Sequence, residues 1–259
     1  MKKLLPIFLI VLLLIVGGVF FFLNRKKTPS VPVEAPTTVL PIEERPFIQL
    51  SLDSQAHNLK LQVLGIRQAS SVEYELIYFA NEYQKGVIGS GQVEDGSRFS
   101  KDLLLGSCSR NVCRYDENVT GGNLTLKLRG SGTTQKYIIP FSVYGGTGKT
   151  QTLTLEEGNF SLEATLTKGS FYLLGSTVGL PEMPEGKIIG GPVGIFSSTE
   201  TKDSGKIQIS LSQEASNAQV LAWDKGSSSW KKLTDGFKIN AQKAEVSISA
   251  LTTFVVVIP

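Results

Sequence analysis

The chain has 259 residues, with 26 Lys and Arg, 23 Asp and Glu, two Cys and one His. Five of the basic residues lie among the first 27 residues, so the remainder carries 21 basic and 23 acidic residues and a net charge of −2. This balance argues against the basic face that nucleic-acid binding needs. The scarcity of His and Cys argues against metal-dependent and His-dependent catalysis, and we predict no cofactor and no metal site.

The first predicted element is a membrane span. Residues Leu4–Leu23 are uncharged and apolar, and basic residues lie on both sides of them. Twenty residues at about 1.5 Å each give a helix of roughly 30 Å, the thickness of the hydrocarbon core of a bilayer. A cleaved signal peptide is the alternative, but no small-x-small cleavage site follows the apolar run. We therefore predict an uncleaved single-pass helix over residues 4–23, with residues 1–3 as a short cytoplasmic end.

A proline-rich stalk is predicted next. The stretch Thr28–Pro46 holds five of the eleven prolines, and such chain favours the extended polyproline II conformation. We therefore predict that residues 24–46 are a basic flank and a stalk. The basic residues on both sides of the span leave its orientation nearly undecided. The stalk, the β patterning beyond it and two close cysteines favour an extracytoplasmic location of the folded part, at the cell membrane.

From Phe47 onward, apolar and polar residues alternate. A period of two places one face of a strand on a core and the other in water. The pattern predicts strands at 59–63, 124–128, 137–143, 151–155, 207–211 and 246–249, and a central strand at 254–258, which is apolar on both faces. Turn-forming clusters at 94–97, 120–123, 203–205 and 225–227 separate such runs. The predicted fold class is all-β, with two β-sandwich (Ig-like) domains in tandem over residues 47–144 and 150–259.

The segment from Ser70 to Gly86 is ambiguous. Ser70 and Glu73 have the spacing of a helix capping box, apolar residues recur at helical spacing, and a Gly ends the segment. Val72, Tyr74, Leu76 and Tyr78 also alternate, and the residue types favour β structure. We favour a strand.

Two segments match functional motifs in part. Gly145–Thr150 ends as a phosphate-binding loop does, but Val143 stands where that loop needs its first Gly, and a strand pattern follows. Asp116–Gly121 begins like a calcium loop, but Lys127 stands where the bidentate acid is needed. We interpret the first as an interdomain turn and the second as an Asx-turn that leads into a hairpin.

The two cysteines are close together. A four-residue spacer lets Cys108 and Cys113 close a disulfide across a turn, which we favour over free thiols and over a metal site. A second hypothesis is a transpeptidase of the sortase type, which would use Cys108 with His57 and an Arg. The Thr-Leu-x-Thr-Cys motif of such enzymes is absent, and we assign no catalytic residue.

Trp223 and Trp230 lie on either side of a predicted turn. If buried, they form a cross-strand pair in a sandwich core; if exposed, they can stack on a sugar ring. We favour the core, and we hold Trp223, Trp230 and Tyr115 as candidate glycan-binding aromatics.

Two resemblances follow from local motifs. Residues 188–259 combine Ile189–Ile195, the Trp-Asp…Trp-x-x-Leu hairpin at 223–233 and the closing strand Leu251–Val257, and they resemble terminal β-sandwich modules of bacterial surface proteins. The segments 105–109 and 112–116 resemble the ectodomain of uncharacterised bacterial membrane-anchored proteins. Both resemblances imply a fold and supply no catalytic residues.

The expected function is that of a single-pass, membrane-anchored structural or adhesive protein. Its folded part would contact envelope proteins, glycans or other cells, and it would bind the lipid bilayer through residues 4–23. The alternatives are a glycan-binding ectodomain that uses Trp223 and Trp230, and a Cys108-dependent transpeptidase. We expect no nucleic-acid partner and no enzyme activity.

Overall fold

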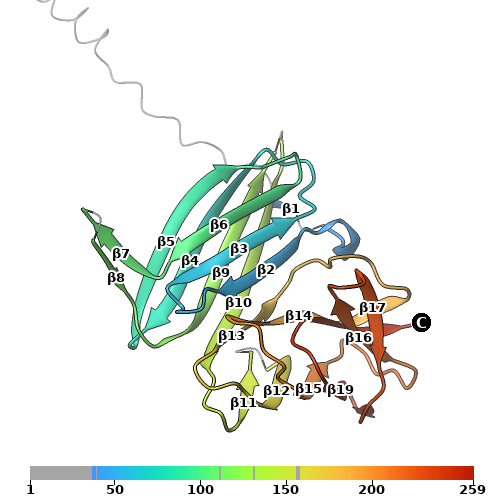
Figure 1. Ribbon diagram of the computed structural model, residues 1–259. Helices are drawn as coiled ribbons and strands as arrows, with labels where there is room; N and C mark the ends of the chain where they lie inside the picture. Colours follow the sequence, from blue (N-terminus) through green and yellow to red (C-terminus); the bar gives the residue numbers. More distant parts are fainter. Residues whose placement is uncertain (1–36, 39, 111, 131, 156–157) are drawn as a thin grey trace, which may run out of the picture. The chain divides into compact units, whose positions relative to one another are not determined.

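The computed structural model describes residues 37–38, 40–110, 112–130, 132–155 and 158–259 (Figure 1). The predicted membrane helix at residues 4–23 and the stalk up to residue 36 lie outside the described residues. Within the described ranges, no helix has the length and apolar character needed to cross a membrane.

The described chain is all-β, as the sequence predicts, and its one helical element is the short 3-10 helix η1 (Ile42–Glu44). The strands of the first half are β1 (Thr37–Thr38), β2 (Phe47–Leu52), β3 (Asn58–Leu64), β4 (Ser71–Ala80), β5 (Tyr83–Gln92), β6 (Arg98–Leu104), β7 (Gly106–Ser109), β8 (Val112–Tyr115), β9 (Val119–Arg129) and β10 (Thr134–Gly145). The strands of the second half are β11 (Thr150–Thr154), β12 (Phe160–Thr165), β13 (Phe171–Ser176), β14 (Lys187–Ser197), β15 (Gly205–Ser210), β16 (Gln219–Asp224), β17 (Ser229–Leu233), β18 (Lys238–Asn240), β19 (Lys243–Ile248) and β20 (Thr253–Ile258).

One large sheet runs through both halves. Its order is β17-β16-β20-β14-β13-β10-β9-β4-β5, and β1 pairs with β10 beside this path. Strand β10 connects the halves, because Thr134–Ser142 pair with β9 and Phe141–Gly145 pair with β13 (Figure 1). At 12 residues, β10 is long enough to pair with β9 on one edge and with β13 on the other edge.

The first half is a sandwich. Its second layer is the three-stranded sheet β2-β3-β6. Alternate residues of β3 (Leu59, Leu61 and Val63) and of β9 (Leu124, Leu126 and Leu128) are fully buried and belong to one apolar cluster, the first core. The period of two in the sequence therefore reports the faces of these strands correctly.

The second half is also sandwich-like. Its second layer is the five-stranded sheet β11-β12-β15-β19-β18, and its apolar cluster is the second core. On β20, Phe254 and Val256 contribute to the second core, whereas Val255 and Val257 belong to a smaller third cluster on the opposite face. Strand β20 lies between β14 and β16, so the central strand predicted from its doubly apolar sequence is confirmed.

The packing does not stop at the predicted border, Tyr144–Lys149. Leu173 and Val178 follow the border in sequence but belong to the first core. The Ile48 N–H on β2 also donates to the Thr177 carbonyl at 2.9 Å. The loop between β10 and β11 lies at the predicted position, yet one sheet and one core extend across it. The division into two Ig-like domains stays a prediction.

The last part of the predicted stalk belongs to the fold. Thr37 and Thr38 pair with β10, and Ile42 of η1 packs against the third cluster. Arg45 Nε donates to the Leu40 carbonyl at 2.7 Å. The prolines at 41 and 46 are compatible with this packed segment, because proline fits extended and turn positions that need no backbone donor.

The ambiguous segment Ser70–Gly86 is a hairpin of β4 and β5, so the favoured strand is confirmed and the helix is wrong. Asn81 and Glu82 connect the strands with φ values of 48° and 68°, which is typical of a type I′ turn. Gly86, which resembles a helix C-cap in the sequence, lies within β5.

The turn predicted at residues 120–123 is wrong, because β9 continues through it. Here the register with β4 shifts between Phe79 and Ala80, as in a β-bulge. A Cβ on Gly122 would collide with the carbonyl oxygen of Ile77, so this Gly allows a close approach of two backbones. The sequence cannot distinguish such a Gly from one in a turn.

Candidate functional site

The two tryptophans form a cross-strand pair, as predicted, but they do not lie in the core. Trp223 on β16 pairs with Trp230 on β17, and their ring centroids are 5.3 Å apart in an edge-to-face arrangement. Val220 of β16 belongs to the second core, so Leu221 and Trp223 take the opposite face by alternation. Both rings are half-buried, and the predicted core position is therefore wrong.

Trp230 is the anchored member of the pair. Its indole Nε1–H donates to the Glu182 carbonyl at 2.8 Å, and its ring packs against the third cluster, which contains Leu180, Leu221, Val255 and Val257. Trp223, in contrast, lines two clefts, one of about 600 Å³ and one of about 420 Å³. Trp230 thus supports Trp223, which is the ring in contact with the open space.

We call the larger of these two spaces the Trp223 cleft. Both halves of the chain line it: η1, β2, β3 and the residues after β3 from the first half, and the 180–183 loop, β16 and its turn from the second. Two cross-strand pairs of β2 and β3, Phe47 with Leu64 and Gln49 with Gln62, contribute their outer face. The other lining residues are Ile42, Glu43, Arg45, Gly65, Arg67, Leu180, Pro181, Glu182, Met183 and Lys225.

The Trp223 cleft combines an aromatic ring with polar groups of both signs. Three cations (Arg45, Arg67 and Lys225) and two carboxylates (Glu43 and Glu182) line it, which leaves one net positive charge. Lys225 Nζ lies 5.5 Å from the centroid of the Phe196 ring, within reach of a cation–π contact.

The turn beside Trp223 is well ordered by hydrogen bonds. Asp224 pairs with Lys231 and accepts hydrogen bonds from Ser227 Oγ and from the Gly226 N–H, both at 2.9 Å. The hydrogen bond from Lys231 is the main reason why the pKa of Asp224 lies far below its usual range. This turn fixes the end of β16 and hence the position of the Trp223 ring.

The remaining candidate aromatic, Tyr115, lies elsewhere. Its ring stacks on His57, with centroids 3.6 Å apart and planes within 2° of each other. The pair lines a separate cleft of about 740 Å³ together with Asp116 and Tyr144. Tyr115 and the tryptophans therefore line different clefts, and the structure does not combine them in one site.

The cysteines form the predicted disulfide. Cys108 on β7 and Cys113 on β8 are directly opposed in a small hairpin and are bonded to each other. At the base of this hairpin, Asp116 accepts a hydrogen bond from Tyr78 at 2.7 Å and pairs with Lys85. Burial and the Asp116 carboxylate raise the pKa of Tyr78 far above its usual range.

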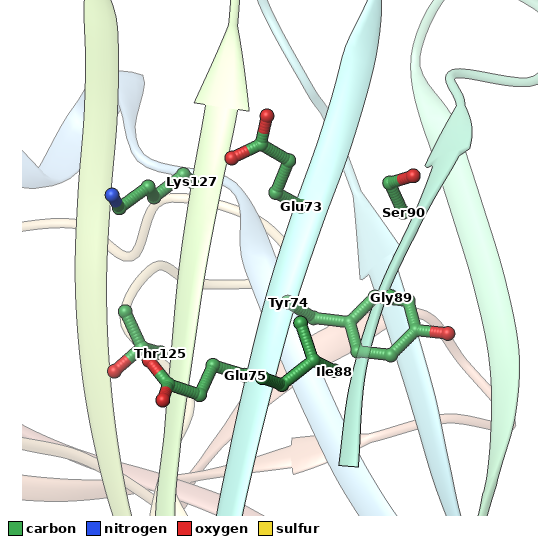
Figure 2. A pocket seen from close by; sticks show the side chains of 8 residues that line it. All are labelled: Glu73, Tyr74, Glu75, Ile88, Gly89, Ser90, Thr125 and Lys127. Atoms are coloured by element: carbon green, nitrogen blue, oxygen red, sulfur yellow. The ribbon is translucent and has the colours of Figure 1, made fainter. Parts of the chain in front are cut away.

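A further hollow of about 430 Å³ lies on β4, β5 and β9 (Figure 2). Tyr74 and Gly89, which lie next to each other in Figure 2, line this hollow. The other lining residues are Glu73, Glu75, Ile88, Ser90, Thr125 and Lys127. Glu73 is already bound by Arg129, whose Nε and Nη2 lie 2.5 and 2.8 Å from its carboxylate oxygens. This pairing leaves the hollow less suited than the Trp223 cleft to a charged or aromatic-stacking ligand.

Sequence reasoning identified Trp223 and Trp230 but missed most of the cleft around them. Arg45, Arg67, Gln49 and Gln62 carry no motif, and only the folding of β2 and β3 beside the 180–183 loop brings them together. Within the described ranges, no group of three His, Cys, Asp or Glu residues is arranged to hold a metal ion.

No protein-family model, no curated protein and no solved structure matches the chain. The resemblance to β-sandwich modules of bacterial surface proteins therefore stays a prediction.

Proposed function

We propose that the chain is a membrane-anchored, extracytoplasmic interaction protein of the cell envelope, and that its folded part binds a glycan in the Trp223 cleft. The observation that carries this proposal is the position of Trp223, which lies half-buried on the outer face of the large sheet instead of in the core.

The lining of the cleft supports a sugar ligand. A half-exposed indole offers an apolar face for the C–H groups of a sugar ring, while amides and guanidinium groups bond to hydroxyl and carboxylate oxygens. The Trp223 cleft supplies an indole, the Gln49 and Gln62 amides, and the Arg45 and Arg67 guanidinium groups. Its one net positive charge favours an acidic glycan over a neutral one.

The anchor and the location are supported by the sequence. The apolar run at residues 4–23 has the length of a bilayer span, and the proline-rich stretch follows it. The disulfide fits an oxidising compartment. A structural or adhesive role is compatible with a glycan ligand, because attachment to an envelope polysaccharide is itself adhesion.

The disulfide argues against a Cys108-dependent transpeptidase. Cys108 is bonded to Cys113, so its sulfur has no free thiol that could ionise and attack a substrate. His57 is stacked on Tyr115.

The proposal can be tested by calorimetry on the full chain in detergent, with polygalacturonate as an acidic probe and dextran as a neutral one. We expect heat of binding with polygalacturonate, and Trp223→Ala should weaken it by about tenfold, equivalent to about 1.4 kcal/mol. Tyr83→Ala is the matched control, because Tyr83 is an exposed aromatic on β5 outside the cleft. Its affinity should equal that of the parent.

A second pair of variants tests the charge. Arg45→Gln with Arg67→Gln should weaken polygalacturonate binding and leave any dextran binding unchanged, since only the acidic glycan gains from the cations. No binding of either probe, or equal loss with Trp223→Ala and Tyr83→Ala, would overturn the proposed site.

A further inference from the structure

The large sheet has an open edge at β5. Strand β5 is the last in the sheet order, so within the described part of the chain no strand pairs with its outer side. It is ten residues long, about 34 Å, and two large apolar side chains on it, Tyr83 and Ile88, are 73% and 79% exposed.

Strand β5 lacks the features that usually protect an edge. Such strands are commonly short, charged, bulged or interrupted by proline. At the other end of the same sheet, β17 has only five residues and carries Lys231 and Lys232. Strand β5 has one charged residue, Lys85, which pairs with Asp116, and its pairing with β4 is regular over all ten residues. The contrast between the two edges indicates that the β5 edge is covered in the functional state.

The register shows which backbone groups face outward. Ala80 and Tyr83 close the two-residue turn, so they are a hydrogen-bonded pair and the odd-numbered residues of β5 bond to β4. The Val93 N–H, which donates to the Ser70 carbonyl at 2.9 Å, continues this alternation. The N–H and C=O groups of the even-numbered residues (84, 86, 88, 90 and 92) therefore point to the open side.

We propose that β5 pairs with β5 of a second copy of this chain, antiparallel, about a two-fold axis at Ile88. In this register Ile88 meets Ile88 of the copy, Gly86 meets Ser90, and Gln84 meets Gln92. Each pair is compatible: two exposed apolar side chains cover each other, and the two amides can bond to one another.

The charges also fit a second copy. Lys85 lies opposite Gly91 of the copy, six residues or about 20 Å away from the copy's Lys85, so no like charges are opposed. The five outward-facing residues of each copy exchange their N–H and C=O groups with those of the other, which satisfies the edge along its whole length. The inference is independent of the proposed glycan site, which lies on other strands.

Cysteine cross-linking of the full chain in detergent tests the axis directly. Paired residues at such an axis have Cα atoms about 5.5 Å apart, within disulfide range. Ile88→Cys should give a disulfide-linked dimer under mild oxidation, with the 88–88 linkage identified by peptide mapping. The native cysteines are already bonded to each other.

Ile138→Cys is the matched control. Ile138 is also an exposed Ile, at 61%, but it lies on β10, with β9 and β4 between it and β5. It should give no dimer above background. Because both positions are exposed, neither change should affect folding.

A second measurement uses sedimentation. Ile88→Lys places two ammonium groups on the axis and should weaken the dimer by at least about tenfold, whereas Ile138→Lys should leave it unchanged. A monomeric parent, equal cross-linking at positions 88 and 138, or linkage of position 88 only to a different protein would each overturn the inference.

Discussion

Because one sheet runs through both halves, a substitution that destabilises the first core should also lower the unfolding free energy of the second half. Both tryptophans of the chain, Trp223 and Trp230, lie in the second half, so tryptophan fluorescence reports mainly on that half, with a contribution from the first-half residues that line the Trp223 cleft. The perturbation is Leu126→Ala, in the first core. If β10 couples the halves, the fluorescence transition of this variant will shift although the substitution lies in the other half.

The magnitude follows from the surroundings of Leu126. Its side chain is fully buried, and Tyr74 and Tyr137 flank it on the neighbouring strands β4 and β10. Because β9 is held on both sides, the cavity cannot collapse easily, and we expect a loss of about 3–4 kcal/mol in unfolding free energy. For a unit of this size, with a urea dependence of about 3 kcal/mol per molar, the midpoint should fall by roughly 1 M.

The assay is urea unfolding of the full chain in detergent, followed by tryptophan fluorescence and by far-ultraviolet circular dichroism. The two signals should shift together in Leu126→Ala, and Thr125→Ala, on the outer face of the same strand, should leave both near the parent values. If the fluorescence midpoint stays fixed while circular dichroism shows a separate, earlier transition, the halves unfold independently and the reasoning from the shared sheet is refuted.

Two further predictions concern other parts of the fold. Gly122→Ala should lower the melting temperature of the chain by several degrees, because the new Cβ would collide with the Ile77 carbonyl oxygen. Gly145→Ala is the control, because a Cβ at that position meets no neighbour. Equal melting temperatures of the two variants would contradict the close approach. Burial raises the pKa of Asp203, but hydrogen bonds from Tyr172 and Thr167 outweigh it and lower the pKa below its usual value. The stabilisation is therefore present above about pH 4 and is lost as the pH falls through the folded-state pKa. Asp203→Asn should lack this dependence when unfolding is measured between about pH 2 and 5. A variant whose unfolding free energy changes with pH as that of the parent does would contradict the assignment.

Local patterns predicted the strands well because alternation depends on neighbours in the sequence. The faces of β3, β9 and β20 follow directly from their residue order. Prediction failed where contacts with distant segments determine the local conformation or the face on which a side chain lies. The Gly121-Gly122 pair lies in a bulged strand because β4 is adjacent, and Trp223 faces outward because the second core occupies the other face of β16.

The candidate site was even less accessible from the sequence. Trp223 and Trp230 stand out by residue type. The Trp223 cleft, however, also needs β2 and β3 to lie beside the 180–183 loop, which follows them by more than a hundred residues in the sequence. The continuity of the large sheet was also hidden, because the pairing of β10 with β13 leaves no signal in either strand alone. Tyr115 was a candidate by composition only, and its stacking on His57 could not be read from spacing.

The position of η1 has a mechanical consequence. Ile42, Glu43 and Arg45 line the Trp223 cleft, and they lie at the C-terminal end of the proline-rich stretch Thr28–Pro46. If the proposed anchor holds the chain in a membrane, a ligand bound in this cleft would transmit its load to the chain near η1. The load would pass through η1 and through the strands that line the cleft, β2, β3 and β16, and the strands that do not line the cleft would lie outside that path.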